Sequence, residues 1–427
     1  MTGKEVKYIY LIFLAMLLLL SPSLYALTLD EAVKTALENN HRIKEQEALV
    51  GAEEGRVASK KSAFLPGATL SYSFMRQDNV ISPFQTRESS VLSAELTYNL
   101  FNGLRDRRAL QAEEARLDAS RYQKKAVEAD IILETKRAYI EVLRAEKNLG
   151  VAREAVGLLQ RQMRDAGLYY REGLIAKNDL LKVEVELASA KQDLIRAKGN
   201  LRVARRRLER TTGKKLADEA LDEIARPSFV SYKETRLREM MLKNRSELKY
   251  LRALRQARMY GMEGIRGGYL PSLDVSLTHD RYGESYLPDG RDGLPGTQTR
   301  AMVVARWNIF DGLRKSNDIK AEKAEIRALK ERLMDMEDEL SLQFRTALEN
   351  YRVAGERLGV SKKAVEQADE NYRITENRFR QRMATTTDLL DARFLLTRAR
   401  IEHNNARYDI YLSMAEIDRV VERREVY

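Results

Sequence analysis

The sequence contains no cysteine, and it has little histidine, tryptophan or proline. Among its 427 residues are 3 His, 1 Trp and 7 Pro. The lack of cysteine excludes disulfides, thiolate metal sites, thiol nucleophiles and lipidation of an amino-terminal cysteine. The histidines, His41, His279 and His403, are scattered, and no nucleophile or phosphate-loop motif accompanies them. We therefore expect no enzyme, no metal site and no cofactor, and we interpret His279 as a surface residue.

All seven prolines lie outside helical patterns, at segment ends, in loops, in the leader or between the two halves described below. A proline inside a helix would cost about 3 kcal/mol or more, so the helices of this chain can be long. One third of the residues are charged and 44% are apolar, with abundant Leu, Ala, Glu, Lys and Arg. This composition is typical of long helices or coiled coils.

A long apolar run occurs only at the amino terminus, and no later segment is apolar enough for a transmembrane helix. Lys4 and Lys7 precede the apolar residues 9–20, and small residues follow up to Ala26. A basic start, a short apolar run and a small-residue exit describe a secretory signal peptide. A membrane anchor would need roughly 20 apolar residues. We therefore predict a signal peptide over residues 1–26, cleaved after Ala26.

The net charge is +11, with a pI near 9.4. Basic and acidic residues alternate along the helical segments, which indicates solvated helix faces and not a nucleic-acid-binding surface. The one dense cluster, 205–207 with Arg210, closes a helical segment, where cations favour the helix dipole. We expect no nucleic-acid partner.

The chain repeats itself at an offset of 209 residues. Residues 99–105 recur as 308–314, and Asp179-Leu180-Leu181 recurs as Asp388-Leu389-Leu390. This offset is far longer than a solenoid repeat, which has about 20 to 50 residues. A register without insertions indicates a duplicated half-protein with fixed element lengths. We predict one half over 27–213, a linker over 214–231 and a second half over 232–427.

Each half contains a pair of segments in which apolar and polar residues alternate, over 66–100 and 270–309. Alternation over roughly ten residues is typical of membrane β-strands, apolar outside and polar inside. Tyr98 and Trp307 occupy equivalent positions at strand ends and fit an aromatic girdle at the membrane interface. The alternative is a soluble sandwich hairpin with Trp307 in its core.

Each half also contains one long and two shorter helical segments. They cover about 28–62, 102–168 and 178–212 in the first half and about 232–264, 311–376 and 387–424 in the second. At 1.5 Å per residue, each long helix spans roughly 100 Å, which matches two shorter helices stacked end to end. Apolar seams on two sides of the long helices suggest a closed ring of helices.

The strand number predicts an oligomer. Four strands per chain do not close a membrane barrel, which begins at about eight strands, and lipid does not tolerate an open sheet edge. Two copies would nearly fill their lumen with side chains, whereas three copies would leave an open pore. We therefore predict a mainly α fold with a membrane β-barrel part, assembled as a trimer with twelve strands continued by a long α-helical barrel.

The turns between the long and short helices carry further motifs. In residues 170–181, Gly173 permits the turn and Asn178 or Asp179 is expected to cap the returning helix; the second turn covers 379–392. Together with the Thr28-Leu29-Asp30-Glu31-Ala32 start, the Phe-Asn/Asp-Gly-Leu strand exits and the two Asp-Leu-Leu tips, the whole mature chain resembles the TolC-like outer-membrane efflux family.

The resemblance implies a homotrimeric channel-tunnel that crosses the outer membrane and extends through the periplasm of a Gram-negative bacterium. It also implies passive conduction of substrates from a periplasmic adaptor and an inner-membrane pump, in tripartite efflux or type I secretion. The tips that would contact the adaptor comprise Gly173, Leu174, Ile175, Asp179, Leu180, Arg382, Met383, Asp388 and Leu389.

By resemblance, Asp388 and Asp391 match paired aspartates that ring the periplasmic mouth of the tunnel. Six carboxylates in a trimer would attract cations and raise some of their pKa values by repulsion. The alternative is that Asp388 only caps the helix after Thr387. The sequence departs from the family at Arg382, where Gly is frequent, and at Ala384, where a gate-locking Arg is found. Arg380 or Arg382 is a candidate substitute for that arginine.

The other function compatible with the sequence is a soluble periplasmic coiled-coil protein, either an adaptor or a scaffold. An adaptor has one helical hairpin between split β-domains, whereas this chain has two hairpins. A scaffold would not need alternating segments at duplicated positions.

Overall fold

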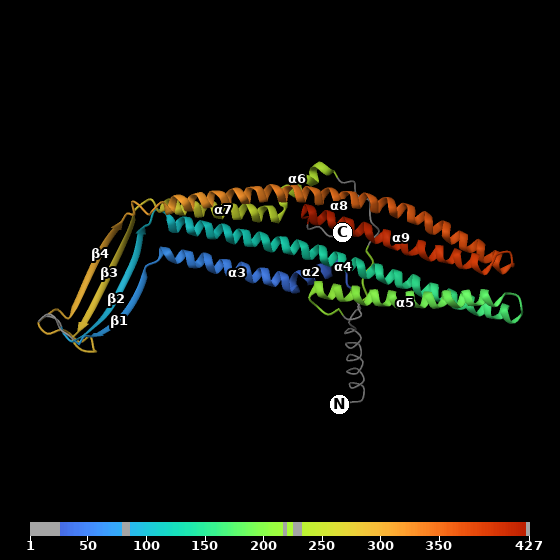
Figure 1. The fold of residues 1–427 in the computed structure, drawn as a ribbon, viewed down its shortest axis with the longest axis horizontal. Coiled ribbons are helices and arrows are strands. Elements are labelled where there is room, and N and C mark those ends of the chain that lie inside the picture. The colour runs from blue at the N-terminus through green and yellow to red at the C-terminus, as the bar shows by residue number, and fades with distance from the viewer. Residues whose placement is uncertain (1–25, 79–85, 217–219, 225–232, 424–427) are drawn as a thin grey trace, which may run out of the picture. The chain divides into compact units, whose positions relative to one another are not determined.

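The computed structural model describes residues 26–78, 86–216, 220–224 and 233–423 (Figure 1). The predicted signal peptide, except Ala26, lies outside the described residues, as does much of the predicted linker. The chain forms two compact units. Unit 1 comprises Met1–Ile43, Glu128–Glu239 and Gln343–Tyr427, and unit 2 comprises Lys44–Val127 and Met240–Leu342.

Unit 2 contains a four-stranded antiparallel sheet in the order β1-β2-β3-β4. Strands β1 (Gly67–Arg76) and β2 (Glu88–Phe101) form one hairpin, and β3 (Ser272–Gly283) and β4 (Thr297–Arg306) form the other. The register places Leu70 opposite Ala94, and Ala94 opposite His279. Both alternating segments are therefore confirmed as strand pairs, and β1 and β4 form the two edges of the sheet.

The register brings the alternation of all four strands into phase. Leu70, Leu96, Leu277 and Val303 belong to one face, and many of the residues between them, such as Ser71, are polar. The apolar face is open in the single chain, where 72% of Leu70 and 65% of Val303 are exposed. His279 belongs to this strand surface, not to a loop, and it is exposed, with Nδ1 2.8 Å from the hydroxyl of Thr299.

Two long helices leave the sheet through the duplicated strand exits. Helices α4 (Arg105–Arg171) and α8 (Arg314–Arg380) have 67 residues each, and both begin within three residues of their predicted starts. Each exit places a Gly-Leu pair in the left-handed region: φ is 72° and 64° at Gly103 and Leu104, and the second exit is alike. The same two-residue turn thus redirects the chain from strand to helix in both halves.

The predicted single helix over 28–62 is wrong. The structure has α2 (Leu29–Asn39) and α3 (His41–Lys61), separated by Asn40 with an extended ψ of 129°. The Asn40 amide donates to the carbonyl of Thr211 and its Oδ1 accepts from the Arg42 N–H. These bonds replace the helical path at this residue.

The prediction over 232–264 fails in the same way. The structure has α6 (Glu234–Asn244) and α7 (Ser246–Gly267), and Arg245 between them leaves the helical region with a ψ of 121°. The returning helices are continuous, as predicted: α5 covers Lys177–Thr212 and α9 covers Thr386–Val421.

The core of unit 1 lies where α2, α4, α5 and α9 meet. Tyr139, Leu208, Tyr408 and Ile410 are almost fully buried there. The Tyr139 hydroxyl donates to the carbonyls of Leu27 and Asp222, so a tyrosine fixes the strand-like segment 220–224 against the helices. Among the described residues, none of the helices combines the length and the apolar character needed to cross a membrane.

Candidate functional site

The two helical turns of unit 1 have the same backbone geometry. In the first, Leu174 N–H donates to the carbonyl of Tyr169, and in the second, Met383 N–H donates to that of Arg378; both distances are 2.8 Å. These pairs are related by the 209-residue offset. Gly173 has φ of 71° and its counterpart Arg382 has φ of 61°. The second turn therefore places a residue with a side chain in a conformation that favours glycine.

The first residues of α9 form a capping box. The N–H and hydroxyl of Thr385 both donate to Oδ2 of Asp388 at 2.8 Å, and the Asp388 N–H donates back to the Thr385 hydroxyl at 3.1 Å. The hydrogen bond from the Thr385 backbone, followed by that from its hydroxyl, lowers the pKa of Asp388. Asp388 therefore remains an anion at the tip of the single chain.

The first turn is capped differently. The residue before α5 is Ala176, which makes no side-chain cap, so the expected capping by Asn178 or Asp179 is wrong. Asp179 instead faces Lys182, with 3.5 Å between Oδ1 and Nζ. Lys182 also donates to the hydroxyl of Thr387 at 3.1 Å. A lysine of the first half thus ties the two tips together.

The two tips enclose a groove of about 300 Å3. Tyr169 and Phe379 lie in its wall with their ring centroids 6.5 Å apart. The predicted tip residues that line it are Leu174, Ile175, Asp179 and Arg382. A partner that reaches this groove would meet apolar side chains flanked by an acid and a base.

The other predicted tip residues are distributed around the groove. Gly173 and Met383 are exposed, whereas Leu180 is half-buried over a small apolar core that includes Leu159 and Val183. Leu389 is buried, with 4% of its surface exposed, so its side chain is not available for an adaptor contact. Burial follows from its place in α9 beside Leu390, which packs into the same core.

Asp388 and Asp391 are both exposed and lie three residues apart, so they project from one side of α9. The nearby arginines are engaged within their own hairpin. Arg380 pairs with Glu376 at 3.0 Å, and Arg378 donates to the carbonyl of Met383. The assignment of Arg380 or Arg382 as the substitute for the gate-locking arginine stays a prediction.

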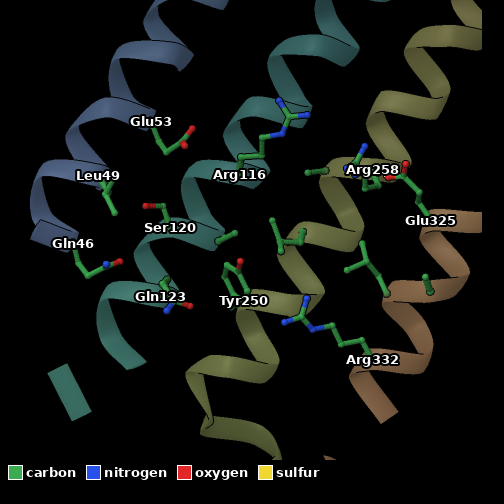
Figure 2. Close-up of a pocket in the computed structure, with 15 residues that line it drawn as sticks. Gln46, Leu49, Glu53, Arg116, Ser120, Gln123, Tyr250, Arg258, Glu325 and Arg332 are labelled. Atoms are coloured by element: carbon green, nitrogen blue, oxygen red, sulfur yellow. Dashed lines mark ion pairs between the residues drawn. The ribbon is translucent and has the colours of Figure 1, made fainter. Parts of the chain in front are cut away.

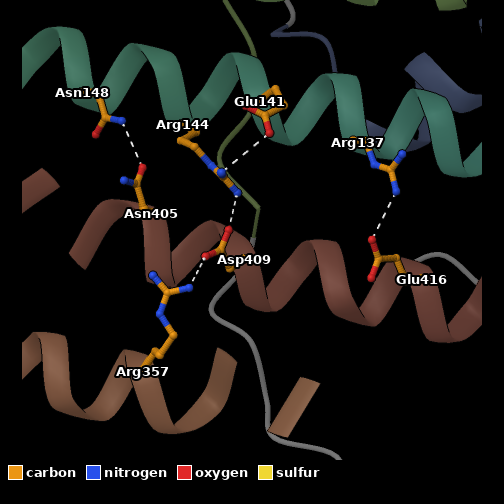
Figure 3. Close-up of polar contacts among 8 residues, drawn as sticks. All are labelled: Arg137, Glu141, Arg144, Asn148, Arg357, Asn405, Asp409 and Glu416. Carbon is orange, nitrogen blue, oxygen red and sulfur yellow. Dashed lines mark hydrogen bonds and ion pairs between the residues drawn. The ribbon is translucent and has the colours of Figure 1, made fainter. Parts of the chain in front are cut away.

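Further along unit 1, polar contacts tie α9 to both long helices (Figure 3). Asp409 of α9 accepts from Arg144 of α4 at 2.7 Å and from Arg357 of α8 at 3.2 Å. Asn148 donates to Asn405 at 3.2 Å. At Arg400, nine residues before Asp409, the charges are exchanged: the arginine lies on α9, and its acidic partners lie on α4 and α8. The sequence did not reveal these pairs, because their partners are far apart along the chain.

Unit 2 contains a second hollow, of about 580 Å3, lined by α3, α4, α7 and α8 (Figure 2). Leu49, Leu254 and Leu329 form part of its wall. Arg258 pairs with Glu325 at 2.9 Å, and Arg116 pairs with Glu113. Apolar side chains and paired charges thus line the same surface.

The predicted girdle residues lie at the helical end of the sheet. Trp307 follows β4, is 64% exposed, and donates from Nε1 to the carbonyl of Tyr269 at 3.0 Å. Tyr98 belongs to the apolar face of β2. The alternative, a soluble sandwich hairpin with Trp307 in its core, disagrees with the structure, because the Trp307 side chain is exposed in the single chain.

Comparison with known proteins gives a consistent result. A family model described as "Outer membrane efflux protein" matches residues 32–214 and 237–421. The chain is 25% identical to outer membrane protein TolC of Vibrio cholerae over 421 residues, 94% of this chain and 92% of that protein. It is 23% identical to TolC of Escherichia coli, covering 91% of this chain and 81% of that protein.

A solved structure, the Campylobacter jejuni CmeC outer membrane channel, superimposes with a TM-score of 0.80 at 17% identity. The alignment covers 92% of this chain and 85% of CmeC. The predicted fold class, long helices joined to a membrane β-sheet, is thereby confirmed.

Proposed function

Because the chain belongs to the outer membrane efflux protein family, we propose that it is the trimeric outer-membrane component of a tripartite efflux or type I secretion system. At the level of the family, it is an outer-membrane efflux channel and not an enzyme, with its helices in the periplasm. In the proposed assembly, an inner-membrane pump supplies the energy, an adaptor connects the pump to the helical tips, and the channel conducts passively.

One observation carries the proposed trimer: the sheet has one open apolar face and two free edges. Strands β1 and β4 have ten residues each, and among the described residues neither is paired on its outer side. In lipid, unpaired backbone groups cost several kcal/mol each, so the edges of neighbouring copies must pair. Three copies give twelve strands and a lumen wide enough to conduct.

The proposed entrance is the ring formed by Asp388 and Asp391. In a trimer these residues supply six carboxylates around one axis, which attract cations. Repulsion between copies would raise the pKa of Asp388, and the capping hydrogen bonds from Thr385 counteract that rise because they favour the charged form. The proposed adaptor contact consists of the exposed tip residues Gly173, Leu174, Arg382, Met383 and Asp388 together with the half-buried Ile175 and Asp179.

Membrane fractionation tests the trimeric channel. The full-length protein is expected in the outer-membrane fraction, resistant to extraction by urea, and as a heat-sensitive trimer on denaturing gels. A soluble periplasmic scaffold or adaptor would instead be released with the periplasm. Such release would overturn the proposal.

Conductance in planar lipid bilayers tests the entrance. Divalent or trivalent cations added on the periplasmic side are expected to block the wild-type channel, and the D388N/D391N variant is expected to lose most of that block. The matched control is Asp179→Asn, which removes the equivalent carboxylate from the first half. Equal block of all three proteins would show that the two aspartates do not form the entrance.

A further inference from the structure

The apolar face of the sheet is interrupted by polar side chains at the end of β3 and β4 that lies away from the helices (Figure 1). The register places His279 opposite Thr299 and Arg281 opposite Thr297, and all four side chains are exposed. They share the face of Leu277, because residues two apart along a strand point to the same side. These four residues are called here the polar patch.

The first half has a matching pair of residues with different chemistry. Arg76, the last residue of β1, is opposite Glu88, the first residue of β2. Thr297, the first residue of β4, lies 209 residues after Glu88, which is the offset of the duplication, and it is opposite Arg281. Arg281 therefore takes the place of Arg76 in the second hairpin, and Thr297 takes the place of Glu88.

This exchange leaves only the second arginine without an acid. Nη1 of Arg76 lies 3.5 Å from Oε1 of Glu88. In the described part of the chain, Arg281 forms no ion pair. The neighbouring Asp280 points to the other face of the sheet, where it pairs with Arg300 at 2.8 Å. The Arg281 guanidinium is thus an uncompensated cation on the apolar face.

The polar patch lies at the level of a membrane interface. Trp307 and Thr297 are ten residues apart, which is about 33 Å along an extended strand. A strand tilted by about 40° rises about 25 Å over that length, the height of the apolar band of membrane barrels. Tyr72, in register with Arg281 through Leu92 of β2, fits an aromatic belt near this level. Trp307 is next to the helices, so the patch belongs to the opposite interface, at the outer leaflet.

The chemistry of the polar patch suits a phosphate group. A guanidinium forms paired, charge-assisted hydrogen bonds with phosphate oxygens. The hydroxyls of Thr297 and Thr299 are further donors, and His279 engages Thr299 through Nδ1, which leaves Nε2 directed to other partners. An arginine that only extends its head group toward water would account for Arg281, but not for three further polar side chains on a lipid-facing surface.

We propose that the polar patch of each copy binds a phosphate group of an outer-leaflet lipid. This site rests on the proposed barrel and lies on its outer surface, so it is distinct from the conducting lumen. Arg281 contacts the phosphate, Thr297 and Thr299 donate hydrogen bonds to it, and the acyl chains lie along the apolar face near Leu277. A trimer has three such sites, one for each copy.

Native mass spectrometry of trimers purified from outer membranes tests the site, with lipid A, a diphosphorylated glycolipid, as the probe. The wild-type trimer is expected to bind up to three molecules. Arg281→Gln is expected to weaken binding about tenfold or more, because it removes hydrogen bonds between charged groups. Thr297→Glu keeps Arg281 but places a carboxylate opposite it, as in the Arg76–Glu88 pair, and is expected to cause a similar loss. These two variants are independent measurements if one of them assembles poorly.

The matched control is Arg76→Gln, which removes the same charge from the arginine that Glu88 already neutralises. We expect it to bind lipid A as the wild type does. An equal concentration of inorganic phosphate is expected not to displace the lipid; displacement would indicate a site for the free anion and overturn the lipid assignment. Equal binding by the wild type, Arg281→Gln and Thr297→Glu would also overturn it, and the proposed channel would stand if heat-sensitive trimers are present. If no trimer is found in the membrane, both proposals fail.

Discussion

At the scale of single residues, the two strand exits differ in sequence only at Asn102 and Asp311 within residues 101–105 and 310–314, but they have different surroundings. Gly103 and Gly312 have φ of 72° and 68°. A Cβ on Gly103 would lie 2.0 Å from the carbonyl oxygen of Gly267, whereas a Cβ on Gly312 would meet nothing within 4 Å. The first glycine is required by close packing of two backbones, and the second only by its conformation.

This difference predicts unequal effects of the same substitution. Gly312→Ala is expected to cost about 1–2 kcal/mol through backbone strain alone. Gly103→Ala must in addition separate two backbone segments, so we expect it to abolish folding of the junction. The measurement is the yield of heat-sensitive trimer in the outer membrane, with both variants expressed at equal levels. Equal yields would contradict the close approach of Gly103 and Gly267.

The helical turns offer a second residue pair with opposite expectations. Arg382 adopts a left-handed φ that glycine adopts without strain, as Gly173 does at the equivalent position. Arg382→Gly is therefore expected to stabilise the second turn by up to about 1 kcal/mol, and Gly173→Ala to destabilise the first by a similar amount. Hydrogen exchange of the Met383 and Leu174 amides measures each turn locally. Faster exchange of Met383 in Arg382→Gly would refute the expected relief of strain.

The sequence predicts the cap of α9 but not the hydrogen bond between the two tips. Thr385 and Asp388 have the same three-residue spacing as Thr28 and Glu31, which form the capping box of α2, so this spacing predicts the cap of α9. The hydrogen bond between Lys182 and Thr387 could not be predicted from the sequence, because it joins residues 205 positions apart. Its existence depends on how two hairpins pack, which local patterns do not encode.

At the scale of helices and strands, the long elements were predictable and the helix breaks were not. The 67-residue helices follow from sustained apolar seams without proline. The breaks at Asn40 and Arg245 carry no proline or glycine; at Asn40, the amide is held by the carbonyl of Thr211, in a helix 171 residues away. A tertiary contact therefore overrides local helix propensity at this point.

The contacts of α9 predict that removing the charge of Asp409 lowers the stability of the protein. Asp409 is one quarter exposed and bridges Arg144 and Arg357, so Asp409→Asn leaves two guanidinium groups facing each other. Hydrogen bonds to charged groups contribute about 1.5–3 kcal/mol when buried, and partial exposure reduces the expected loss to about 1 kcal/mol. The apparent thermal midpoint at a fixed scan rate is the measurement.

Glu402→Gln provides the matched control for Asp409→Asn. Glu402 lies on the same helix and faces the same Arg357, but at 3.9 Å and with 54% of its side chain exposed. We expect Glu402→Gln to leave the thermal midpoint of the protein almost unchanged. An effect equal to that of Asp409→Asn would mean that the bridge to Arg144 contributes nothing.

The α8–α9 contact is also expected to depend on pH. Burial, and then the charges of Arg407 and Lys362, lower the pKa of His403 below 6.5. The folded protein therefore resists protonation that the unfolded chain accepts. The resulting stability is complete above pH 6.5 and is lost as the pH falls toward the lower folded pKa. His403→Gln, which can keep a hydrogen bond to Ser361, is expected to show a smaller loss of thermal midpoint between pH 7.5 and pH 5. An unchanged pH dependence would assign the loss to other groups.

At the scale of the whole molecule, the duplication predicts the order and lengths of the helices and strands but not how copies of the chain assemble. Both halves supply a hairpin, a long helix and a returning helix at the same offset, and this much was readable because element lengths repeat. The halves diverge where the chain meets its surroundings: Lys182 and Asp179 occur in one tip, Asp391 and Asp388 in the other. Identical halves would give equivalent tips, so the proposed entrance requires that divergence.

The same reasoning predicts how the sheet responds to charge on its two faces. Leu70 and Ser71 are neighbours in edge strand β1, both are exposed in the single chain, and they point to opposite faces of the sheet. In a closed barrel Leu70 faces lipid and Ser71 faces the lumen. A lysine on the lipid face costs about 2–4 kcal/mol near the middle of the bilayer, whereas a lysine in the lumen stays hydrated. Leu70→Lys is therefore expected to reduce insertion strongly, and Ser71→Lys to leave it almost unchanged. The measurement is the fraction of purified protein that folds into lipid vesicles and becomes heat-modifiable. Equal folding of the two variants would mean that Leu70 does not face lipid, and this result would rule out the proposed barrel.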